Sequence, residues 1–177
     1  MKKPQQGSYN KQSLPEGAEI VVMKNTKENE AVCILAALGA DYVILVHRVY
    51  AQACLDPTTE DGFSSGTFDK VIDALHEKGK MAIVVSCQLP YDAARFPEAD
   101  AILLTYWGSV MRELPAENSS WSANLPVGLL SCFGLCEANG KLPVNIPALD
   151  EAYQPTDEIL WLRGYAVHGT GKEETEE

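Results

Sequence analysis

The chain has 177 residues, of which 46% are apolar and 22% charged, the composition of one globular domain with a sizeable core. Its net charge is −11 and its pI is near 4.7, which argues against nucleic acid and anionic membrane surfaces as partners, because phosphate groups are bound by clustered Lys and Arg. It has neither an apolar run of the roughly 20 residues that span a bilayer nor a signal peptide at its start, so a soluble protein is expected, unless the chain is a piece of a longer exported one.

The two ends of the chain differ in composition from its middle. Residues 1–17 are polar and contain two prolines and two glycines, which predicts an extended or disordered lead-in. Residues 169–177 end in the acidic run KEETEE and are expected to form a solvated tail. The segment 18–168 between them is predicted to fold as a single α/β domain.

The first part of this domain is predicted to be a strand, a helix and a second strand. Ala18–Lys24 is apolar and β-branched, with Ile20–Met23 at its centre, and Asp41–His47 is another continuous apolar run, centred on Val43–Val46. Lys27–Leu38 between them has helical periodicity. The residues expected on the inward face of this helix are Ala31, Ile34, Leu35 and Leu38.

The same pattern then repeats. Thr67–Glu77 has helical periodicity, and Gly79 follows it as a residue that can end a helix. Met81–Cys87 is a buried strand by its apolar character, and Ala101–Tyr106 is a shorter one after a loop. The residues expected on the inward face of the second helix are Val71, Ile72 and Leu75.

Strands without a polar face, separated by helices or loops, are typical of a parallel sheet covered on both sides. The predicted fold class is therefore α/β, a three-layer αβα sandwich around a mainly parallel sheet of about five or six strands. In open sheets of this kind, ligands bind at the carboxyl ends of the strands. The places where a site is expected are thus the segments after His47, after Cys87 and after Tyr106.

The C-terminal third adds a helix, a short strand and an extension. Val127–Cys136 is predicted to be a buried helix that stops at the turn pair Asn139 and Gly140. Pro143–Pro147 alternates apolar and polar residues between two prolines, which predicts a short edge strand that ends the sheet. The extension Asp157–His168 must then pack on the domain or on a partner through its apolar residues Ile159, Leu160, Leu162 and Tyr165.

The cysteines and histidines do not predict a metal site or a cofactor. Five cysteines are scattered without a CxxC pair, and four lie in apolar context, so they are expected to be buried, reduced thiols. The histidines His47, His76 and His168 are far apart in the sequence, and each is interpreted as a strand-end or surface residue.

Several motifs occur in a fixed order along the chain: Leu89–Asp92 (LPYD), Glu98–Ala101 (EADA), Thr105 with Tyr106, Phe133 with Gly134, and Gly140–Pro147 (GKLPVNIP). In this order they resemble the C-terminal α/β domain of family-three glycoside hydrolases, the group of β-glucosidases and β-N-acetylhexosaminidases. The resemblance covers about Ile20 to Ile146 and leans toward the hexosaminidase branch.

That resemblance implies a non-catalytic or accessory role. In the family, the nucleophilic aspartate comes from an N-terminal barrel, which needs about 250 residues and has no room here. The resemblance thus implies no catalytic residue to carry over, a catalytic barrel as partner in the same or another polypeptide, and a carbohydrate as ligand. The alternative is an independent small α/β enzyme that acts on a small polar substrate at the strand ends, although the sequence has no G-x-S-x-G elbow and no Gly-rich phosphate loop.

One residue is a candidate for the family's acid/base. In the glucosidase branch this residue resembles a Glu in the loop after the second strand, here Arg48–Gly66, where Glu60 precedes Asp61 and Gly62. The arginine of the family pattern is absent, and hexosaminidase-type members place the acid/base on the barrel. The other interpretation of Glu60 is a solvated acidic turn, in which Ser64, Ser65 and Thr67 lead to the N-cap of the next helix.

Two residues are candidates for substrate binding. Asp92 could contact a sugar, or it could cap the short helix AARF that follows it. Trp107 could stack on a sugar ring, as could Trp121 and Trp161, or these aromatics could close a strand or hold a loop. Asp69 and Asp73, four residues apart on a helix, are interpreted as one solvated face rather than an acid/base pair.

Overall fold

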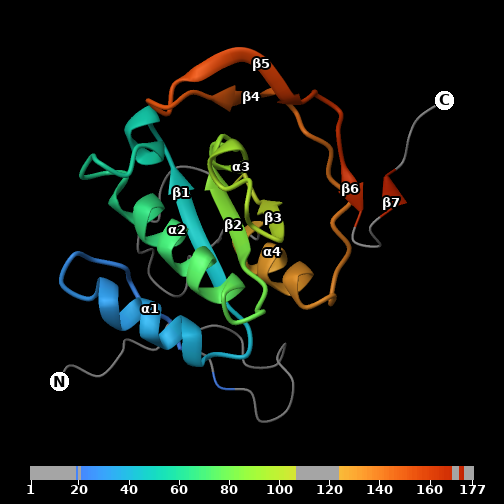
Figure 1. The fold of residues 1–177 in the computed structure, drawn as a ribbon. Helices are drawn as coiled ribbons and strands as arrows, with labels where there is room; N and C mark the ends of the chain where they lie inside the picture. The colour runs from blue at the N-terminus through green and yellow to red at the C-terminus, as the bar shows by residue number, and fades with distance from the viewer. Residues whose placement is uncertain (1–18, 20, 107–123, 169–171, 174–177) are drawn as a thin grey trace, which may run out of the picture.

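A computed structural model of the chain describes residues 19, 21–106, 124–168 and 172–173 (Figure 1). Its helices are α1 (Glu30–Gly39), α2 (Phe63–His76), α3 (Asp92–Arg95) and α4 (Asn124–Cys132), with one 3-10 turn, η2 (Gln52–Leu55). Its strands are β1 (Ile44–Val49), β2 (Ile83–Gln88), β3 (Ala101–Leu104), β4 (Ile146–Leu149), β5 (Pro155–Trp161), β6 (Val167–His168) and β7 (Lys172–Glu173). In this part of the chain, no helix has the length and apolar character needed to cross a membrane.

The centre of the fold is a three-stranded parallel sheet in the order β1-β2-β3. Val46 of β1 lies beside Val85 of β2, which lies beside Leu103 of β3. The mixed α/β class and three of the four predicted parallel strands are thereby confirmed. β2 has four buried residues in a row, as a central strand covered on both faces requires, whereas β1 alternates buried and exposed residues.

Helices cover both faces of this sheet. Val71, Ile72 and Leu75 of α2 are buried in one core cluster with Val84 of β2, as the periodicity of the helix predicted. On the opposite face, α4 approaches β3 so closely that a Cβ at Gly128 would lie 2.5 Å from the Thr105 side chain. The result is helix, sheet and helix in three layers around the described strands (Figure 1).

The strand expected at Ile20–Met23 is not formed at residues 21–23, the part of it that the structure describes. Residues 21–26 have no regular structure, and Val21 is 60% exposed. The side chain of Asn29 accepts a hydrogen bond from Thr26 N at 2.7 Å and donates one to Lys24 O at 2.6 Å. These side-chain bonds to the backbone hold the segment in a local turn, an alternative to pairing in a sheet.

Helix α1 forms as predicted, but it begins at Glu30 and its inward face is narrower than expected. Ile34 and Ala37 pack against the core cluster, whereas Ala31 is exposed and Leu35 is 68% exposed. The helix contacts α2 beside the sheet rather than lying flat on it, so only one row of its side chains is covered.

Two glycines end helices through the same geometry. Gly79 has φ +65° after α2, where Lys80 N donates to Leu75 O, and this confirms the predicted end. Gly134 has φ +67° after α4, where Leu135 N donates to Leu130 O at 3.0 Å. The predicted stop at Asn139 and Gly140 is therefore wrong, because the left-handed residue already occurs at Gly134. Nor is α4 fully buried: Val127 at its centre is exposed.

The segment Pro143–Pro147 does not form the edge of the parallel sheet. Its last residues, Ile146 and Pro147, belong to β4, which pairs with β5 as an antiparallel hairpin. The pairing register shifts on both sides of Pro147, as expected of a residue that cannot donate a ladder hydrogen bond. The expected last strand of the main sheet is instead part of a hairpin that lies across the carboxyl ends of β1 and β2 (Figure 1).

All five cysteines are free, as expected of reduced thiols. Cys54 and Cys87 are buried, whereas the other three are only half-buried, so the expectation of general burial is wrong for them. Burial raises the pKa of the Cys87 thiol, and it does the same at Cys132. A thiol with a raised pKa carries less of the reactive thiolate at neutral pH.

Asp100 joins the amino ends of β2 and β3 and makes stability depend on pH. Ala82 N donates to Asp100 Oδ2 at 2.7 Å, and His76 Nε2 lies 3.0 Å from the same oxygen. The hydrogen bond from Ala82, followed by that from His76, lowers the pKa of Asp100. A carboxyl group with a lowered folded pKa stabilises the fold above its unfolded pKa, and that contribution is lost as the pH falls through the folded value.

We therefore expect Asp100→Asn to lower the free energy of unfolding by about 1 kcal/mol at neutral pH. The difference from the unchanged chain should shrink as the pH falls below about 4, near the unfolded pKa of an aspartate. Urea unfolding at a series of pH values measures both curves. Two parallel curves across the whole range would contradict the assignment.

Candidate functional site

Residues with positive φ angles and residues with buried polar side chains lie at the carboxyl edge of the parallel sheet. η2 follows β1 there, α3 follows β2, and the turn of the β4–β5 hairpin lies against both. Among the residues that the structure describes, three other than glycine have positive φ: Gln88 (82°) at the end of β2, Tyr106 (47°) after β3 and Tyr153 (58°) in the hairpin turn. Such angles cost free energy and are concentrated at functional sites, so this edge is the candidate site.

A buried polar cluster lies at this edge, where His47 of β1, Ser86 of β2 and Asp92 of α3 meet. His47 Nδ1 lies 3.3 Å from Asp92 Oδ2, and Ser86 Oγ donates a hydrogen bond to Asp92 Oδ1. The three residues are 3%, 2% and 0% exposed. Phe68 and Phe96 pack around the His47 ring, with centroids 5.4 and 5.2 Å away.

The cluster has the residue types of a Ser-His-Asp triad in a different hydrogen-bonding order. A nucleophilic serine needs a hydrogen bond to a histidine, which a carboxylate then orients. Here Asp92 contacts both His47 and Ser86, and solvent reaches none of the three. The arrangement therefore joins β1, β2 and α3, and it presents no nucleophile to a substrate.

This geometry corrects two sequence-based interpretations. His47 was expected at a strand end or on the surface, yet it lies buried inside β1. Asp92 was expected to cap the helix that follows, but no side chain caps α3 and the Asp92 carboxylate turns into the core instead. A sugar could reach Asp92 only if this buried cluster opened.

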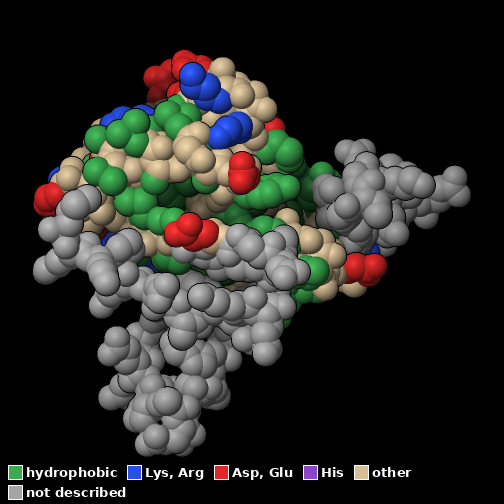
Figure 2. Space-filling model, turned by 90° about the horizontal axis from the view of Figure 1, so that it is seen from below, with side chains coloured by type: hydrophobic (Ala, Val, Ile, Leu, Met, Phe, Trp, Pro, Cys, Tyr) green, Lys and Arg blue, Asp and Glu red, His purple; other side chains and the backbone are tan. Residues whose placement is uncertain are grey.

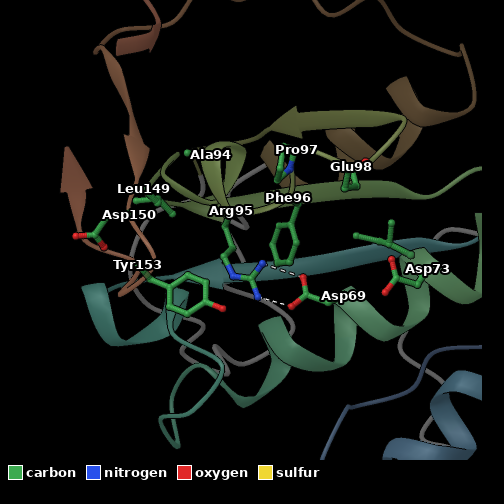
Figure 3. A pocket seen from close by; sticks show the side chains of 11 residues that line it. Asp69, Asp73, Ala94, Arg95, Phe96, Pro97, Glu98, Leu149, Asp150 and Tyr153 are labelled. Carbon is green, nitrogen blue, oxygen red and sulfur yellow. Dashed lines mark hydrogen bonds and ion pairs between the residues drawn. The ribbon is translucent and has the colours of Figure 1, made fainter. Parts of the chain in front are cut away.

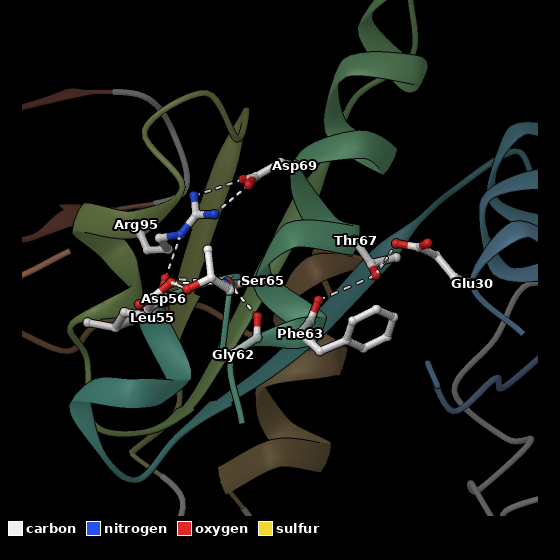
Figure 4. A network of polar contacts seen from close by, with 10 residues as sticks. Glu30, Leu55, Asp56, Gly62, Phe63, Ser65, Thr67, Asp69 and Arg95 are labelled. Atoms are coloured by element: carbon white, nitrogen blue, oxygen red, sulfur yellow. Dashed lines mark hydrogen bonds and ion pairs between the residues drawn. The ribbon is translucent and has the colours of Figure 1, made fainter. Parts of the chain in front are cut away.

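Arg95 ties α3 to the elements around it (Figure 4). Its Nε donates to Leu55 O at 2.9 Å, and its two terminal nitrogens bind both carboxylate oxygens of Asp69 on α2. The guanidinium also lies over the Tyr153 ring, 4.8 Å from its centroid. Asp69 is thus half of a bidentate ion pair and not part of a free acidic face, whereas Asp73 remains exposed as expected.

A pocket of about 330 Å³ opens beside Arg95, between α2, α3 and the hairpin turn (Figure 3). The carboxylates in its lining belong to Asp69, Asp73, Glu98 and Asp150. Arg95 neutralises the first of them, and the others leave the pocket negatively charged. A small ligand would fit by size, but the charge favours a cationic group over a neutral sugar.

Glu60 lies in the turn between η2 and α2 and is exposed. Within the described part of the chain, its carboxylate has no hydrogen-bond or ion-pair partner. The neighbouring Asp61 accepts a hydrogen bond of 2.5 Å from the Tyr50 hydroxyl, which raises the pKa of Tyr50 to about 12. Helix α2 starts at Phe63 with Gly62 at its N-cap, so the serines and threonine expected to lead to the cap lie inside the helix instead.

The tryptophans add little to the site. Trp107 and Trp121, two of the candidates for stacking on a sugar, lie outside the described residues. Trp161 ends β5, where it pairs with Ile146 of β4. Within residues 21–106 and 124–168, no group of three or more His, Cys, Asp or Glu side chains is placed so that it could hold a metal ion.

Comparison with known proteins adds no relative. No protein-family model matches the chain, and no curated protein matches it. The function is therefore inferred from the contacts at the carboxyl edge and from the motifs of the sequence.

Proposed function

We propose that the chain is a non-catalytic accessory domain of a β-glycoside hydrolase of the β-N-acetylhexosaminidase type. It works with a catalytic barrel that lies in the same polypeptide or in a separate one. The observation that carries the proposal is the burial of Asp92, the acidic residue of the LPYD motif, in contact with His47 and Ser86. Because the Asp92 carboxylate is buried and hydrogen-bonded inside the core, we assign the LPYD motif a structural role rather than contact with a substrate.

The surface supports a role beside another protein. Tyr42 and Met81, which precede β1 and β2, are 76% and 63% exposed. Figure 2 views the molecule from this amino-terminal end of the strands and shows hydrophobic side chains gathered across the middle of the face. Large exposed apolar patches mark interaction sites more often than they mark free surface.

The larger αβα sandwich of five or six strands belongs to the same proposal. The described residues supply three parallel strands. Val21, Val22 and Met23 form an apolar, exposed segment of the kind that a further strand would bury. Pairing of this segment with β1 or β3 would extend the sheet.

An independent small α/β enzyme is the second candidate. The positive φ angles of Gln88 and Tyr106 at the strand ends favour it, because strained residues are concentrated where ligands bind. The accessory role is preferred for a chemical reason. A retaining glycosidase needs two carboxyl groups about 5 to 5.5 Å apart, and Glu60 is exposed and unpartnered among the described residues.

The purified chain alone is expected to hydrolyse neither aryl β-glucosides nor aryl β-N-acetylglucosaminides. The nucleophile that begins such a reaction comes from the barrel in the family that the chain resembles. Release of the aryl group is followed by absorbance, with Glu60→Gln as the matched variant. Turnover that survives repurification and disappears in Glu60→Gln would overturn the proposal.

The partner is tested with a family-three catalytic barrel expressed without its own C-terminal domain. Sedimentation of the mixture is expected to show a complex of one chain with one barrel. Substituting Tyr42 and Met81 by serine should weaken that complex if the apolar face is the contact. Sedimentation of the two proteins as separate species would count against the accessory role.

A further inference from the structure

The hairpin of β4 and β5 leaves one strand on the outside of the molecule. β4 contacts α3, while β5 lies on the far side of β4, away from the parallel sheet (Figure 1). Among the described residues, β5 hydrogen-bonds to β4 alone. One edge of β5 therefore carries main-chain N–H and C=O groups that another strand could pair with.

This edge has only part of the protection that natural sheet edges carry. Proline, lysine and bulges normally keep such edges from pairing with other chains. The register of β5 against β4 shifts at two places, but its only proline is Pro155, its first residue, and it has no lysine. Ile159, Leu160 and the following Leu162 are 40%, 41% and 66% exposed. The second half of the strand thus offers an apolar surface beside unpaired backbone groups.

The hairpin is held firmly on its other side. Gln52 Nε2 donates to Tyr153 O in the turn, and Arg95 lies over the Tyr153 ring. Leu149 packs with Tyr153 against the buried residues of η2. Asp150 Oδ1 accepts from two main-chain N–H groups within the turn. A partner strand would therefore meet an edge that is already ordered, which lowers the entropy cost of pairing.

The negative charge of the hairpin determines which kind of partner can bind to β5. Residues 146–163 hold four carboxylates and one cation, so their net charge is −3 (1 − 4). Asp157 and Glu158, next to the apolar half of β5, are both exposed. A second copy of the chain would bring the same negative hairpin and a total charge of −11. Association of two copies at this edge is thus opposed by repulsion.

We propose that β5 is a docking strand for an extended segment of a different polypeptide, in which lysine or arginine alternates with apolar residues. The main chains of the two strands pair, the basic side chains lie on the face of Asp157, and the apolar ones lie on the opposite face and cover Leu160. This mode of recognition takes affinity from main-chain hydrogen bonds and specificity from the side chains. The inference does not depend on the proposed enzyme family, since it uses the hairpin alone.

The probe is a peptide of 7 residues, the length of β5, that alternates lysine and valine. It is added to the full chain, and the backbone amides of the chain are followed by NMR. The largest shifts are expected at residues 155–161. A peptide of equal length that alternates glutamate and valine should bind at least about tenfold more weakly, because its charges repel those of β5. A lysine–valine peptide with N-methyl groups on alternate backbone nitrogens keeps the charge but loses the donors, and it should also lose most of the binding.

Three variants of the chain, one of them a control, test the contact from the side of β5. Leu160→Lys should weaken the lysine–valine peptide about fivefold, since it removes an apolar contact and adds a like charge. Leu35→Lys, on the exposed face of α1, adds the same charge elsewhere and should change the affinity little. The double variant Asp157→Lys/Glu158→Lys should reverse the preference, so that the glutamate–valine peptide becomes the better ligand.

Several results would overturn the proposal. Equal binding of the N-methylated peptide would show attraction by charge without strand pairing. Shifts centred on Asp73 and Glu98 would place the peptide in the acidic pocket. Shifts of β5 that appear without peptide as the chain is concentrated would make a second copy the occupant. If the lysine–valine peptide causes no shift, β5 is not a docking strand.

Discussion

The Gly62→Ala variant is expected to lose roughly 3 kcal/mol of folding free energy, a large share of the stability of a small domain. A Cβ at this position would lie 1.8 Å from the main-chain oxygen of Asp56 and 2.6 Å from that of Ala53. Both are backbone atoms of the segment that joins β1 to α2, so they cannot rotate away as a side chain could. The methyl group can be accommodated only if the turn moves.

Moving that turn would disturb several contacts at once. Gly62 N donates to Thr59 Oγ1 at 2.9 Å, and Gly62 O accepts from Ser65, which is buried at the start of α2. Leu55 O, at the other end of the turn, accepts from Arg95. The predicted loss therefore includes the link between α2 and α3 as well as the steric clash.

Urea unfolding followed by circular dichroism measures the effect, with Gly39→Ala as the matched control. Nothing lies within 4 Å of a Cβ at Gly39, which ends α1 without a positive φ. Its substitution should leave the free energy of unfolding unchanged or raise it by up to about 1 kcal/mol. Equal unfolding midpoints for the two variants would show that the turn accommodates the added methyl group at little cost in free energy.

The parallel sheet could be predicted because its signals are local. The apolar runs Val43–Val46, Met81–Val85 and Ala101–Leu104 mark β1, β2 and β3, and α2 places Val71 and Leu75 on one face. Such patterns need no knowledge of what each element packs against. The apolar segment around Val22 has the same character as β1, yet its described residues form no strand, and the Asn29 side chain binds Thr26 N and Lys24 O in a local turn directly after it. Apolar character alone does not supply a partner strand.

The polar contacts of the carboxyl edge could be predicted only in part. β1 alternates buried and exposed residues, and His47 takes a buried position between Leu45 and Val49. A histidine at an inward position needs a buried polar partner, so this alternation was a usable signal. The pairing of Arg95 with Asp69 had no such signal, because it joins residues 26 positions apart on two helices.

The carboxyl edge also explains why an accessory role fits this fold. In open parallel sheets this edge usually holds the ligand. Here α3 and the hairpin turn fill much of it, and Asp92 and Arg95 are used to hold them there. The acidic pocket beside Arg95 lies next to them in the described part of the chain. Its charge does not suit a neutral sugar, so the proposed sugar chemistry would belong to the barrel.

The Asp92→Ala variant is expected to lose about 3 kcal/mol, since it leaves two buried groups without their partner and each such loss costs about 1 to 3 kcal/mol. Its carboxylate is the hydrogen-bond partner of both His47 and Ser86, and no water can replace it without entering the core. Alanine would leave a buried imidazole beside Phe68 and Phe96, together with a small cavity. The loss should appear in the free energy of unfolding and as a lower thermal midpoint.

Two further variants separate this cause from a general sensitivity of the fold. Asp92→Asn has nearly the same shape, and its amide can accept from Ser86 and donate to His47, so it should lose less than half as much as Asp92→Ala. Asp73→Ala removes an exposed carboxylate from α2 and should stay within about 0.5 kcal/mol of the unchanged chain. If Asp92→Ala unfolds at the same urea concentration as Asp73→Ala, the buried cluster does not hold β1, β2 and α3 together, and Asp92 becomes available again as a residue that meets a ligand.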